Sequence, residues 1–236
     1  MLISIIVPVY NEENLIKKLL IKVNSVKNIK KEIIIVNDGS SDNTLKIIKR
    51  ECKKLYSKLI SYKRNRGKGY ACRKGIKAAK GRILIIQDSD LEYDPKNYHR
   101  LLKPIFLKKT NVVYGSRVLR GGKRTRPKTI SFKIRTFANI FLTFLSNILN
   151  NQELTDAHTC YKVFSNSLIK KIKLKEDGFN FCPEITTKIS KIKEKIIEVP
   201  IDYYGRTIKE GKKIRLLDGI KAIYCLIKYR FESNKQ

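Results

Sequence analysis

The sequence contains few residues that could form a zinc site, a disulfide framework or a catalytic triad. Its five cysteines are odd in number and scattered, and no Cys-x-x-Cys pair occurs. This pattern argues against structural zinc and disulfides and indicates a reducing compartment. Only two histidines are present, His99 and His158. Neither can be assembled with a serine and an acid into a recognisable Ser-His-Asp arrangement.

Several longer motifs are also missing. No apolar stretch reaches the roughly 18 to 20 residues that a membrane-spanning helix needs. The start, MLISIIVPVYNEE, lacks a basic leader and a small-residue cleavage site, so we interpret it as a first strand rather than a signal peptide. A P-loop would need Gly-x-x-x-x-Gly-Lys-Ser/Thr, and a dinucleotide-binding fold Gly-x-Gly-x-x-Gly after the first strand. Neither is found, and Arg-Gly-Lys-Gly at 66–69 only loosely resembles a phosphate loop.

Basic residues, by contrast, are abundant. The 236 residues include 52 Lys and Arg against 21 Asp and Glu, a formal net charge of +31. Such a charge attracts polyanions: nucleic acid, an anionic membrane surface or phosphorylated substrates. About half of this excess can be assigned to a general drift in amino-acid composition that has no functional cause, so individual basic residues matter more than the total.

The first half of the chain predicts alternating strands and helices. Short apolar segments such as EIIIVND and RILIIQ alternate with segments of helical period such as LIKKLLIKV. The helix in GYACRKGIKAAKG is expected to end with Gly81 as its C-cap. Fully apolar short strands separated by helices predict an α/β fold whose mostly parallel sheet carries helices on both faces.

Four polar clusters follow four of the predicted strands. They are Tyr10-Asn11-Glu12, Asn37-Asp38-Gly39, Asp88-Ser89-Asp90 and Gly115-Ser116-Arg117. Ligands of such sheets bind beyond the carboxyl ends of the strands, so topology would gather these clusters on one rim. Any single cluster could be an ordinary polar loop. The acidic cluster together with Asp38 is better explained by a function.

The acidic cluster QDSDLEYDP, residues 87–95, follows the apolar run ILII. Asp88, Asp90, Glu92 and Asp94 repel one another unless a positive charge or water neutralises them. Asp-x-Asp at a strand end presents hard oxygen ligands, which suit Mg²⁺ or Mn²⁺ with water and ligand phosphates completing the shell. A divalent ion on a diphosphate would stabilise the charge that grows as the diphosphate leaves.

The second half is less regular. Residues 118–130 form a basic loop, and the following helix, within 132–151, has no charged residue from Thr136 to Gln152. Its apolar residues cover more than one narrow stripe, which fits either a core helix or a helix lying in a membrane interface. The last stretch, 214–231, is amphipathic, and we expect one apolar side made of Leu216, Leu217, Ile220, Ile223 and Ile227.

Together, VPVYNEEN, IIIVNDGSSDNT, IQDSDLEYDP and VVYGSR resemble the family 2 glycosyltransferases of the GT-A fold. The segments TDAHTCYKVF, GFNFCPEITTKI and EVPIDYYGRTIKEGKKIRLLDGIKAIYCLIKYR narrow the resemblance to the polyprenyl-phosphate sugar transferases of dolichol-phosphate mannose synthase type. The match covers nearly the whole chain, in order. It implies transfer of a sugar from a nucleotide diphosphate sugar to a lipid phosphate, with inversion at the anomeric carbon. It also implies one continuous catalytic domain, with residues 1–117 binding the nucleotide sugar and 118–236 the acceptor.

The resemblance assigns donor-site residues position by position. The positions that hold the nucleotide base and ribose are Pro8, Tyr10, Glu12, Val36 and Asp38. Asp88 and Asp90 match the metal motif, with Ser89 between them in place of the more frequent Ala, and Glu92 takes the place of a third metal ligand. Arg206 and Lys212 match contacts to the donor diphosphate. Cys182 stands where an acid is common before Pro-Glu, which leaves the role of Glu184 open.

The resemblance also assigns the acceptor site. Arg117 matches a residue that meets the acceptor phosphate, and Arg135 matches a second one through a looser alignment. The acceptor is already a phosphate with a second pKa of about 6, so its oxygen is a competent nucleophile without a strong base. Two anionic substrates repel each other. The groups that would cancel this repulsion are the metal and four basic residues, Arg117, Arg135, Arg206 and Lys212.

These inferences predict a metal-dependent enzyme that uses Mg²⁺ or Mn²⁺ with a GDP-mannose or UDP-hexose donor and a polyprenyl or dolichyl phosphate. It would act in the cytoplasm, peripheral to the inner face of a membrane and without a nucleic-acid partner. One alternative is a family 2 glycosyltransferase with a saccharide or other soluble acceptor, which would want a carboxylate base near the anomeric carbon. Another is a non-catalytic basic protein that binds nucleic acid or anionic lipid, although aromatic-rich recognition motifs are absent. The sequence does not specify the sugar, the nucleotide, the lipid length or the oligomeric state.

Overall fold

A computed structural model gives the fold, and it describes residues 1–125, 127, 129–206 and 216–232. A seven-stranded sheet forms its centre, in the order β3-β2-β1-β4-β7-β5-β8. The strands are β1 (Ile3–Val9), β2 (Lys31–Asn37), β3 (Lys58–Ser61), β4 (Ile83–Ile86), β5 (Val112–Ser116), β7 (Lys162–Ser165) and β8 (Ile196–Pro200). β7 runs antiparallel to both of its neighbours, whereas the other strands are parallel to one another. The predicted α/β fold with a mostly parallel sheet is confirmed.

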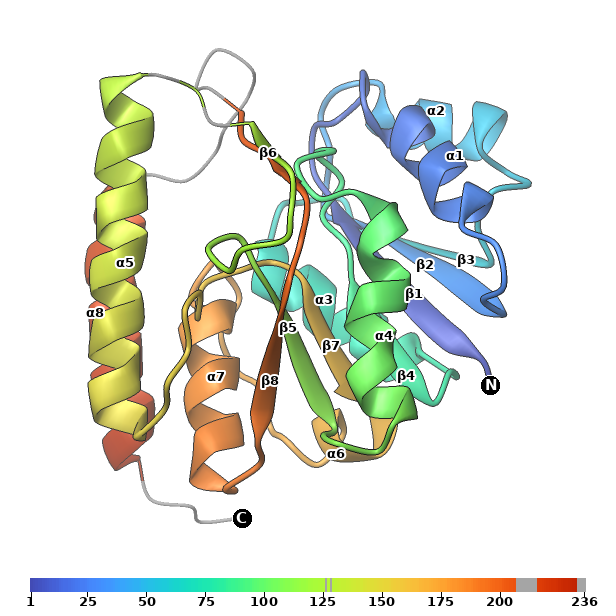
Figure 1. Cartoon of the computed structure of the whole chain (residues 1–236). Helices are drawn as coiled ribbons and strands as arrows, with labels where there is room; N and C mark the ends of the chain where they lie inside the picture. The colour runs from blue at the N-terminus through green and yellow to red at the C-terminus, as the bar shows by residue number, and fades with distance from the viewer. Residues whose placement is uncertain (126, 128, 207–215, 233–236) are drawn as a thin grey trace.

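Helices cover both faces of this sheet (Figure 1). They are α1 (Ile16–Ser25), α2 (Thr44–Glu51), α3 (Lys68–Ala78), a 3₁₀ turn η1 (Pro95–Asn97), α4 (Tyr98–Phe106), α6 (Asn166–Ile169) and α7 (Phe181–Lys191). Successive side chains of a strand point to opposite faces, and β1 shows the result. Ile5 and Val7 join the core beneath α1, α2 and α4, whereas Ile6 joins the core beneath α3 and α7.

The predicted cap at the end of α3 is wrong. The helix ends at Ala78, with Ala79 as its C-cap, and Gly81 lies in the connection that follows. A Cβ on Gly81 would come within 2.6 Å of the backbone nitrogen of Ser4. Glycine is therefore required there by the close approach of β1, not by a helix end.

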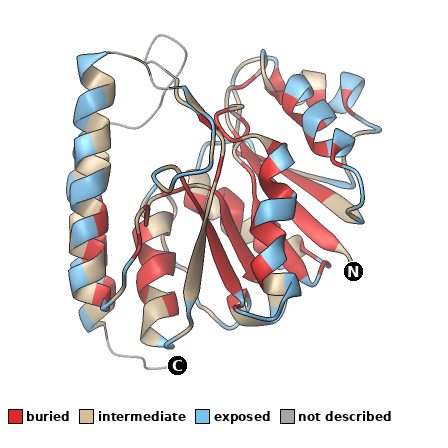
Figure 2. Cartoon of the chain, viewed as in Figure 1, coloured by how far each residue is buried: buried red, intermediate tan, exposed pale blue. Residues whose placement is uncertain are grey.

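Two long helices, α5 (Ile130–Asn150) and α8 (Leu216–Phe231), stand together at one side of the sheet (Figure 1). The buried side chains of α5 are polar, namely Thr143, Ser146 and Asn150, and all lie in its second half. Most of its large apolar residues are instead exposed, and Phe132, Leu142, Leu145 and Leu149 are half-buried (Figure 2). The alternative of a core helix is therefore wrong. An ordinary amphipathic helix of a water-soluble domain buries its apolar side and exposes its polar side, and α5 does the reverse.

Helix α8 also turns much of its expected apolar side outward. Its buried residues are Ala222, Cys225, Leu226 and Tyr229, which pack toward α7 and α5. Of the apolar side expected from the sequence, Leu217, Ile220 and Ile227 are exposed, Ile223 is half-buried, and the side chain of Leu216 lies outside the described set. A small two-stranded sheet, β6 (Arg124–Thr125) with β9 (Tyr203–Tyr204), lies between this helical pair and the rim of the main sheet.

Candidate active site

The carboxyl ends of β1, β2, β4 and β5 meet at one edge of the sheet because these strands are parallel. The four polar clusters predicted from the sequence follow these strands and therefore share this rim (Figure 1). Pro8 and Val36 are buried partners in the β1–β2 register. Tyr10 is half-buried, and Ser89 is buried between the two acids of the Asp-x-Asp motif.

Arg206 gathers three of the carboxylates at this rim. Its Nη2 lies 3.1 Å from Oδ2 of Asp90 and 3.4 Å from Oε1 of Glu12, and its Nε lies 3.8 Å from Oε1 of Glu92. Burial alone would lower the pKa of Arg206, but the carboxylates of Asp90 and Glu12 outweigh it and raise that pKa. The guanidinium supplies positive charge to the acidic cluster, which would otherwise repel itself.

Glu92 fixes the segment that carries Arg206. The carboxylate is almost fully buried, and it accepts a hydrogen bond from the Tyr203 hydroxyl at 3.2 Å. It also accepts one from the backbone N–H of Arg206 at 2.9 Å. The backbone carbonyl of Glu92 accepts from the N–H of Tyr204. These bonds join residues more than a hundred positions apart in the sequence and hold Arg206 over the strand-end acids.

A second basic side chain holds the other acid of the motif. Nζ of Lys68, on the first turn of α3, lies 2.5 Å from Oδ1 of Asp88. Both side chains are largely buried, with exposed fractions of 16% and 13%. Sequence reasoning gave Lys68 no role. The signal that could have found it was the Arg-Gly-Lys-Gly segment, with its loose resemblance to a phosphate loop.

Asp38 anchors the loop that carries Lys68. Its Oδ1 accepts from the backbone N–H of Arg66 at 3.0 Å and its Oδ2 from that of Gly67 at 2.7 Å. Burial raises the pKa of Asp38, and these two hydrogen bonds oppose the rise. The predicted part of Asp38 in nucleotide binding stays a prediction.

On the other side of the rim, Arg117 pairs with Asp156 in a two-pronged contact. Nε and Nη2 of Arg117 each lie 2.7 Å from an oxygen of Asp156, and the backbone N–H of Arg117 donates to the same carboxylate at 3.0 Å. Asp156 is fully buried. Burial would raise the pKa of Asp156, but Arg117 outweighs burial and lowers it. Both groups therefore stay charged at neutral pH.

Asp156 also links this pair to helix α5. Asn139 of α5 donates to Oδ1 of Asp156 at 3.1 Å, and its own carbonyl oxygen accepts from Nη2 of Arg117 at 3.3 Å. Glu198 of β8 accepts the backbone N–H of Asp156 at 2.9 Å. Sequence reasoning missed Asp156 as a site residue, although it lies within the TDAHTCYKVF segment. Its place in that segment was the available signal, because its partner Arg117 lies 39 residues away in the sequence.

The structure brings most of the predicted residues together, but not all of them. Arg135 lies on α5, half-buried, and makes no hydrogen bond through its buried Nη2 to any described residue. Lys212 lies outside the described residues. Within the same limits, no group of three His, Cys, Asp or Glu side chains is arranged to hold a metal ion alone.

Comparison with known proteins gives the family of this chain. The family model for glycosyl transferase family 2 matches residues 4–173, which include all four strand-end clusters. The chain belongs to glycosyltransferase family 2. It is therefore a glycosyltransferase, as the sequence predicts, and the matched region spans both the Asp-x-Asp motif and the Arg117–Asp156 pair.

Two relatives of this glycosyltransferase carry informative names. The UDP-N-acetylglucosamine–dolichyl-phosphate N-acetylglucosaminyltransferase of Methanococcus voltae is 29% identical over 245 residues, covering 96% of this chain and 95% of that protein. The dolichol-phosphate mannosyltransferase of Pyrococcus furiosus is 25% identical over 244 residues, covering 100% of this chain and 66% of that protein. Relatives of this chain thus act on dolichyl phosphate but with different sugars.

A solved structure shares the fold. Glucosyl-3-phosphoglycerate synthase from Mycobacterium tuberculosis, in complex with Mn²⁺, uridine diphosphate and phosphoglyceric acid, superposes with a TM-score of 0.71 at 17% identity. The match covers 99% of this chain and 80% of that one. At this identity, the match shows that the two proteins share the GT-A fold.

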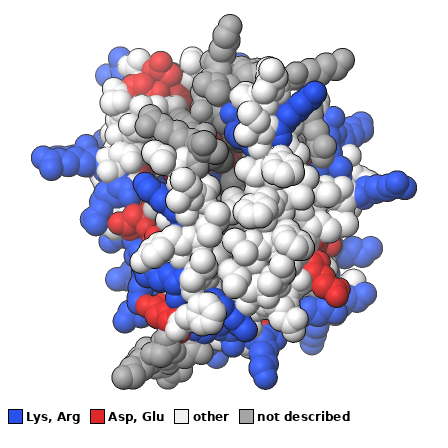
Figure 3. Space-filling model, turned by 90° about the vertical axis from the view of Figure 1, so that its left-hand side faces the viewer, with Lys and Arg blue, Asp and Glu red and all other residues white. Residues whose placement is uncertain are grey.

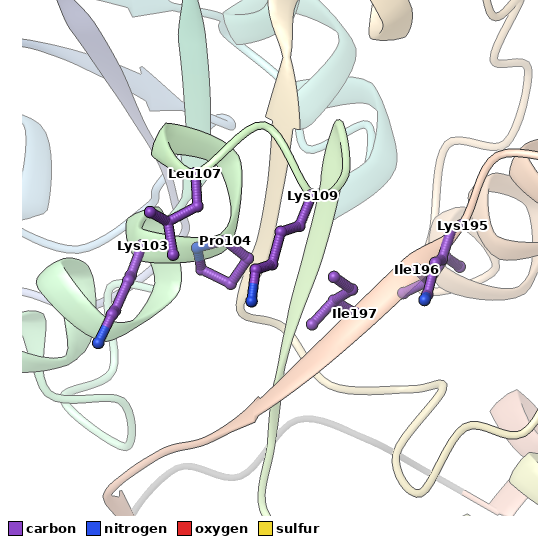
Figure 4. Close-up of a pocket in the computed structure, with 7 residues that line it drawn as sticks. All are labelled: Lys103, Pro104, Leu107, Lys109, Lys195, Ile196 and Ile197. Atoms are coloured by element: carbon purple, nitrogen blue, oxygen red, sulfur yellow. The ribbon is translucent and has the colours of Figure 1, made fainter.

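The glycosyltransferase also has a cavity far from this rim. It has a volume of about 580 Å³ and lies between α4 and β8 (Figure 4). Its lining residues are Lys103, Pro104, Leu107, Lys109, Lys195, Ile196 and Ile197. None of the predicted site residues lines it, so this cavity is not part of the candidate active site.

Proposed function

We propose that this glycosyltransferase moves a sugar from a nucleotide diphosphate sugar to a polyprenyl phosphate at a membrane surface, with inversion and with the help of Mg²⁺ or Mn²⁺. The observation that carries the proposal is the orientation of helix α5, which buries polar residues and exposes apolar ones. Its exposed side is apolar, and its inward side reaches the Arg117–Asp156 pair through Asn139. One helix therefore connects an apolar surface to a phosphate-binding candidate, as a substrate with a lipid tail and a phosphate head requires.

The donor side fits a divalent cation by its chemistry. Asp88 and Asp90 offer hard oxygen atoms at the end of a buried strand, and these would hold Mg²⁺ or Mn²⁺ with Glu92 as the predicted third ligand. Water and the donor diphosphate would complete the shell. The bound cation would supply charge stabilisation for the leaving nucleotide. The structural relative was crystallised with Mn²⁺ and uridine diphosphate, which supports such a donor site.

This chain's own residues would bind and orient the two anionic substrates. Arg206 and Lys212 are proposed to contact the donor diphosphate, and Pro8, Tyr10, Glu12, Val36 and Asp38 the nucleoside. Glu92 orients Arg206 by accepting its backbone N–H. The sugar and nucleotide stay open, since the two named dolichyl-phosphate relatives differ in sugar.

The acceptor phosphate is proposed to meet Arg117 and Arg135. Arg117 is held by Asp156 at a fixed angle, which pre-orients its remaining donors. The buried Nη2 of Arg135, which no described residue satisfies, is an available donor on the same helix as Asn139. The acceptor oxygen needs no strong base at neutral pH, because the second pKa of a phosphate is about 6.

The membrane contact is proposed for the joint outer face of α5 and α8. Its exposed apolar residues are Ile130, Ile134, Phe137, Ile140, Phe141, Phe144, Ile148, Leu217, Ile220, Tyr224, Ile227 and Phe231. Figure 3 shows this side as a broad uncharged area bordered by many Lys and Arg side chains and by fewer Asp and Glu side chains. An apolar face with a cationic border suits an interface with anionic lipid. Within the described part of the chain, no helix combines the length and apolar character needed to cross a bilayer.

A donor and acceptor panel tests the function. The melting temperature is expected to rise with one class of nucleotide sugar when Mn²⁺ or Mg²⁺ is present, because a ligand that binds only the native state stabilises it. With that donor, transfer to a short-chain polyprenyl phosphate should exceed transfer to 3-phosphoglycerate or to a free glycan. Preference for either soluble acceptor would replace the lipid assignment, and no shift with any nucleotide sugar would remove the donor assignment.

Liposome flotation tests the membrane face. Wild type is expected to float with vesicles that contain anionic lipid, and the double variant Phe137→Ser, Phe144→Ser should bind at least about tenfold more weakly, since each buried Phe contributes roughly 1.5–3 kcal/mol. Phe106→Ser is the matched control, because Phe106 is an exposed aromatic residue on α4, away from this face. Equal binding by the double variant and the control would rule out the α5 face.

A further inference from the structure

The Arg-Gly-Lys-Gly segment, residues 66–69, is a rigid platform at the donor side of the rim. Gly67 has φ +101°, and a Cβ there would come within 2.4 Å of the carbonyl oxygen of Asp177. The backbone N–H groups of Arg66 and Gly67 both donate to Asp38. The next residue, Lys68, therefore leaves a fixed backbone and points at the Asp-x-Asp motif.

Lys68 reaches that motif as a charged group. Its Nζ lies 2.5 Å from Oδ1 of Asp88 and 3.0 Å from Sγ of Cys160. The ammonium of Lys68 thus lies against the carboxylate oxygen that a divalent cation would need.

Each acid of the Asp-x-Asp motif forms an ion pair with a basic side chain. Asp88 is paired with Lys68, and Asp90 is paired with Arg206 at 3.1 Å. Lys68 and Arg206 come from segments far apart in the sequence, so the arrangement is not one local ion pair. A cation bound to the same carboxylates would lie within a few ångströms of both basic groups, and like charges at such distances repel strongly.

We propose that Lys68 is a further donor-site residue that exchanges partners when the donor binds. This inference rests on the proposed metal-dependent donor site. Without donor, Lys68 neutralises Asp88; with metal and nucleotide present, the metal takes Asp88 and Asp90, and Lys68 turns to the diphosphate beside Arg206. Among Asp88, Asp90, Lys68 and Arg206, formal charge balances before and after the exchange. The two carboxylates match the divalent cation, and the two basic groups match the two negative charges of a sugar-linked diphosphate.

The exchange makes metal and nucleotide bind together. Metal alone must displace Lys68 and leave its charge without a partner, which weakens binding. Nucleotide supplies the new partner, so the second ligand binds more tightly than it would alone. A residue that only supported the fold would weaken both ligands when replaced. The proposal instead requires effects of opposite sign.

The test uses Lys68→Met with Mn²⁺ as the probe. Free Mn²⁺ is followed by electron paramagnetic resonance without nucleotide, and binding of UDP and GDP by calorimetry with saturating Mn²⁺. The variant is expected to bind Mn²⁺ alone at least about tenfold more tightly, because a unit positive charge near the site is gone. It should bind the preferred nucleotide at least about tenfold more weakly, because a charged contact to the diphosphate is lost.

Two further variants make the result decisive. Lys17→Met removes a lysine from the exposed ion pair with Glu51 and is expected to change neither affinity. Lys68→Gln keeps a polar side chain and should repeat both changes if Lys68→Met does not fold. Unchanged or weaker Mn²⁺ binding by a folded Lys68 variant overturns the exchange. Failure of wild type to bind any nucleotide with Mn²⁺ is a separate result, and it counts against the proposed function.

Discussion

Asp90→Ala is expected to lower sugar transfer by at least about 10²-fold while the protein stays folded. The carboxylate of Asp90 lies at the end of β4, 3.1 Å from Arg206, and is one of the two proposed metal ligands. Its loss removes a ligand from the site where charge on the leaving diphosphate must be stabilised. Initial rates at saturating donor and acceptor, with circular dichroism as a folding check, measure the effect.

Two companion variants separate charge from shape. Asp90→Asn keeps the size of the side chain and removes only its charge, so it should lose nearly as much activity as Asp90→Ala. Asp94→Asn changes another acid of the same stretch, whose carboxylate caps η1 by accepting the N–H of Lys96 at 3.0 Å. Asparagine also caps helices well, so this control should keep its activity. Full activity in Asp90→Asn would end the proposed role of this carboxylate.

Asp156→Ala is expected to lower the free energy of unfolding by about 3 kcal/mol or more, because breaking a buried ion pair leaves the other charge without compensation. Arg117 would lose both short contacts to its partner, and the backbone N–H groups nearby would lose an acceptor. The released arginine should also raise the KM for polyprenyl phosphate more than the KM for the donor. Chemical denaturation and steady-state kinetics give the two readouts.

Glu153→Ala is the matched control for Asp156→Ala, because it removes an exposed acid three residues earlier. The pH dependence gives a second check. The pKa of Asp156 is lowered in the folded state, so its stabilisation is present above the unfolded pKa of about 3.9 and is lost as the pH falls through the folded value. Wild type should therefore lose more stability than Asp156→Ala on acidification in this range. If Asp156→Ala and Glu153→Ala have equal free energies of unfolding, Asp156 does not have this structural role.

The sequence predicted the rim because the rule behind it is local. Apolar strands alternating with helices give parallel neighbours, and the residue after each strand then lies at one edge of the sheet. Asp38, Asp88, Asp90 and Arg117 were found in this way, before any tertiary contact was known. The ion pairs among them could not be found so. Arg206 and Glu92 lie 114 residues apart, and their contact depends on how the chain returns after β8.

Helix α5 shows a second limit. The absence of charge between Thr136 and Gln152 is plain in the sequence, but composition does not say which side of the helix meets the protein. The deciding contacts are hydrogen bonds from Asn139 to Asp156 and from Asn150 to Thr187. They turn these polar residues inward and leave Phe137, Phe141 and Phe144 exposed. The reversed direction of β7 and the close approach at Gly81 were missed for the same reason, since both depend on neighbours distant in the chain.

Because α5 has an inward polar face and an exposed apolar face, substitutions on its two faces should have different consequences. Substitutions at Thr143, Ser146 and Asn150 alter hydrogen-bonded positions of the folded chain and are judged by whether the protein folds. Substitutions at Phe137, Phe144 and Ile148 leave those hydrogen bonds intact and affect only what the exposed face contacts, which is proposed to be the membrane. A deep mutational scan of this helix should therefore give two interleaved profiles, one following abundance and the other following activity in cells.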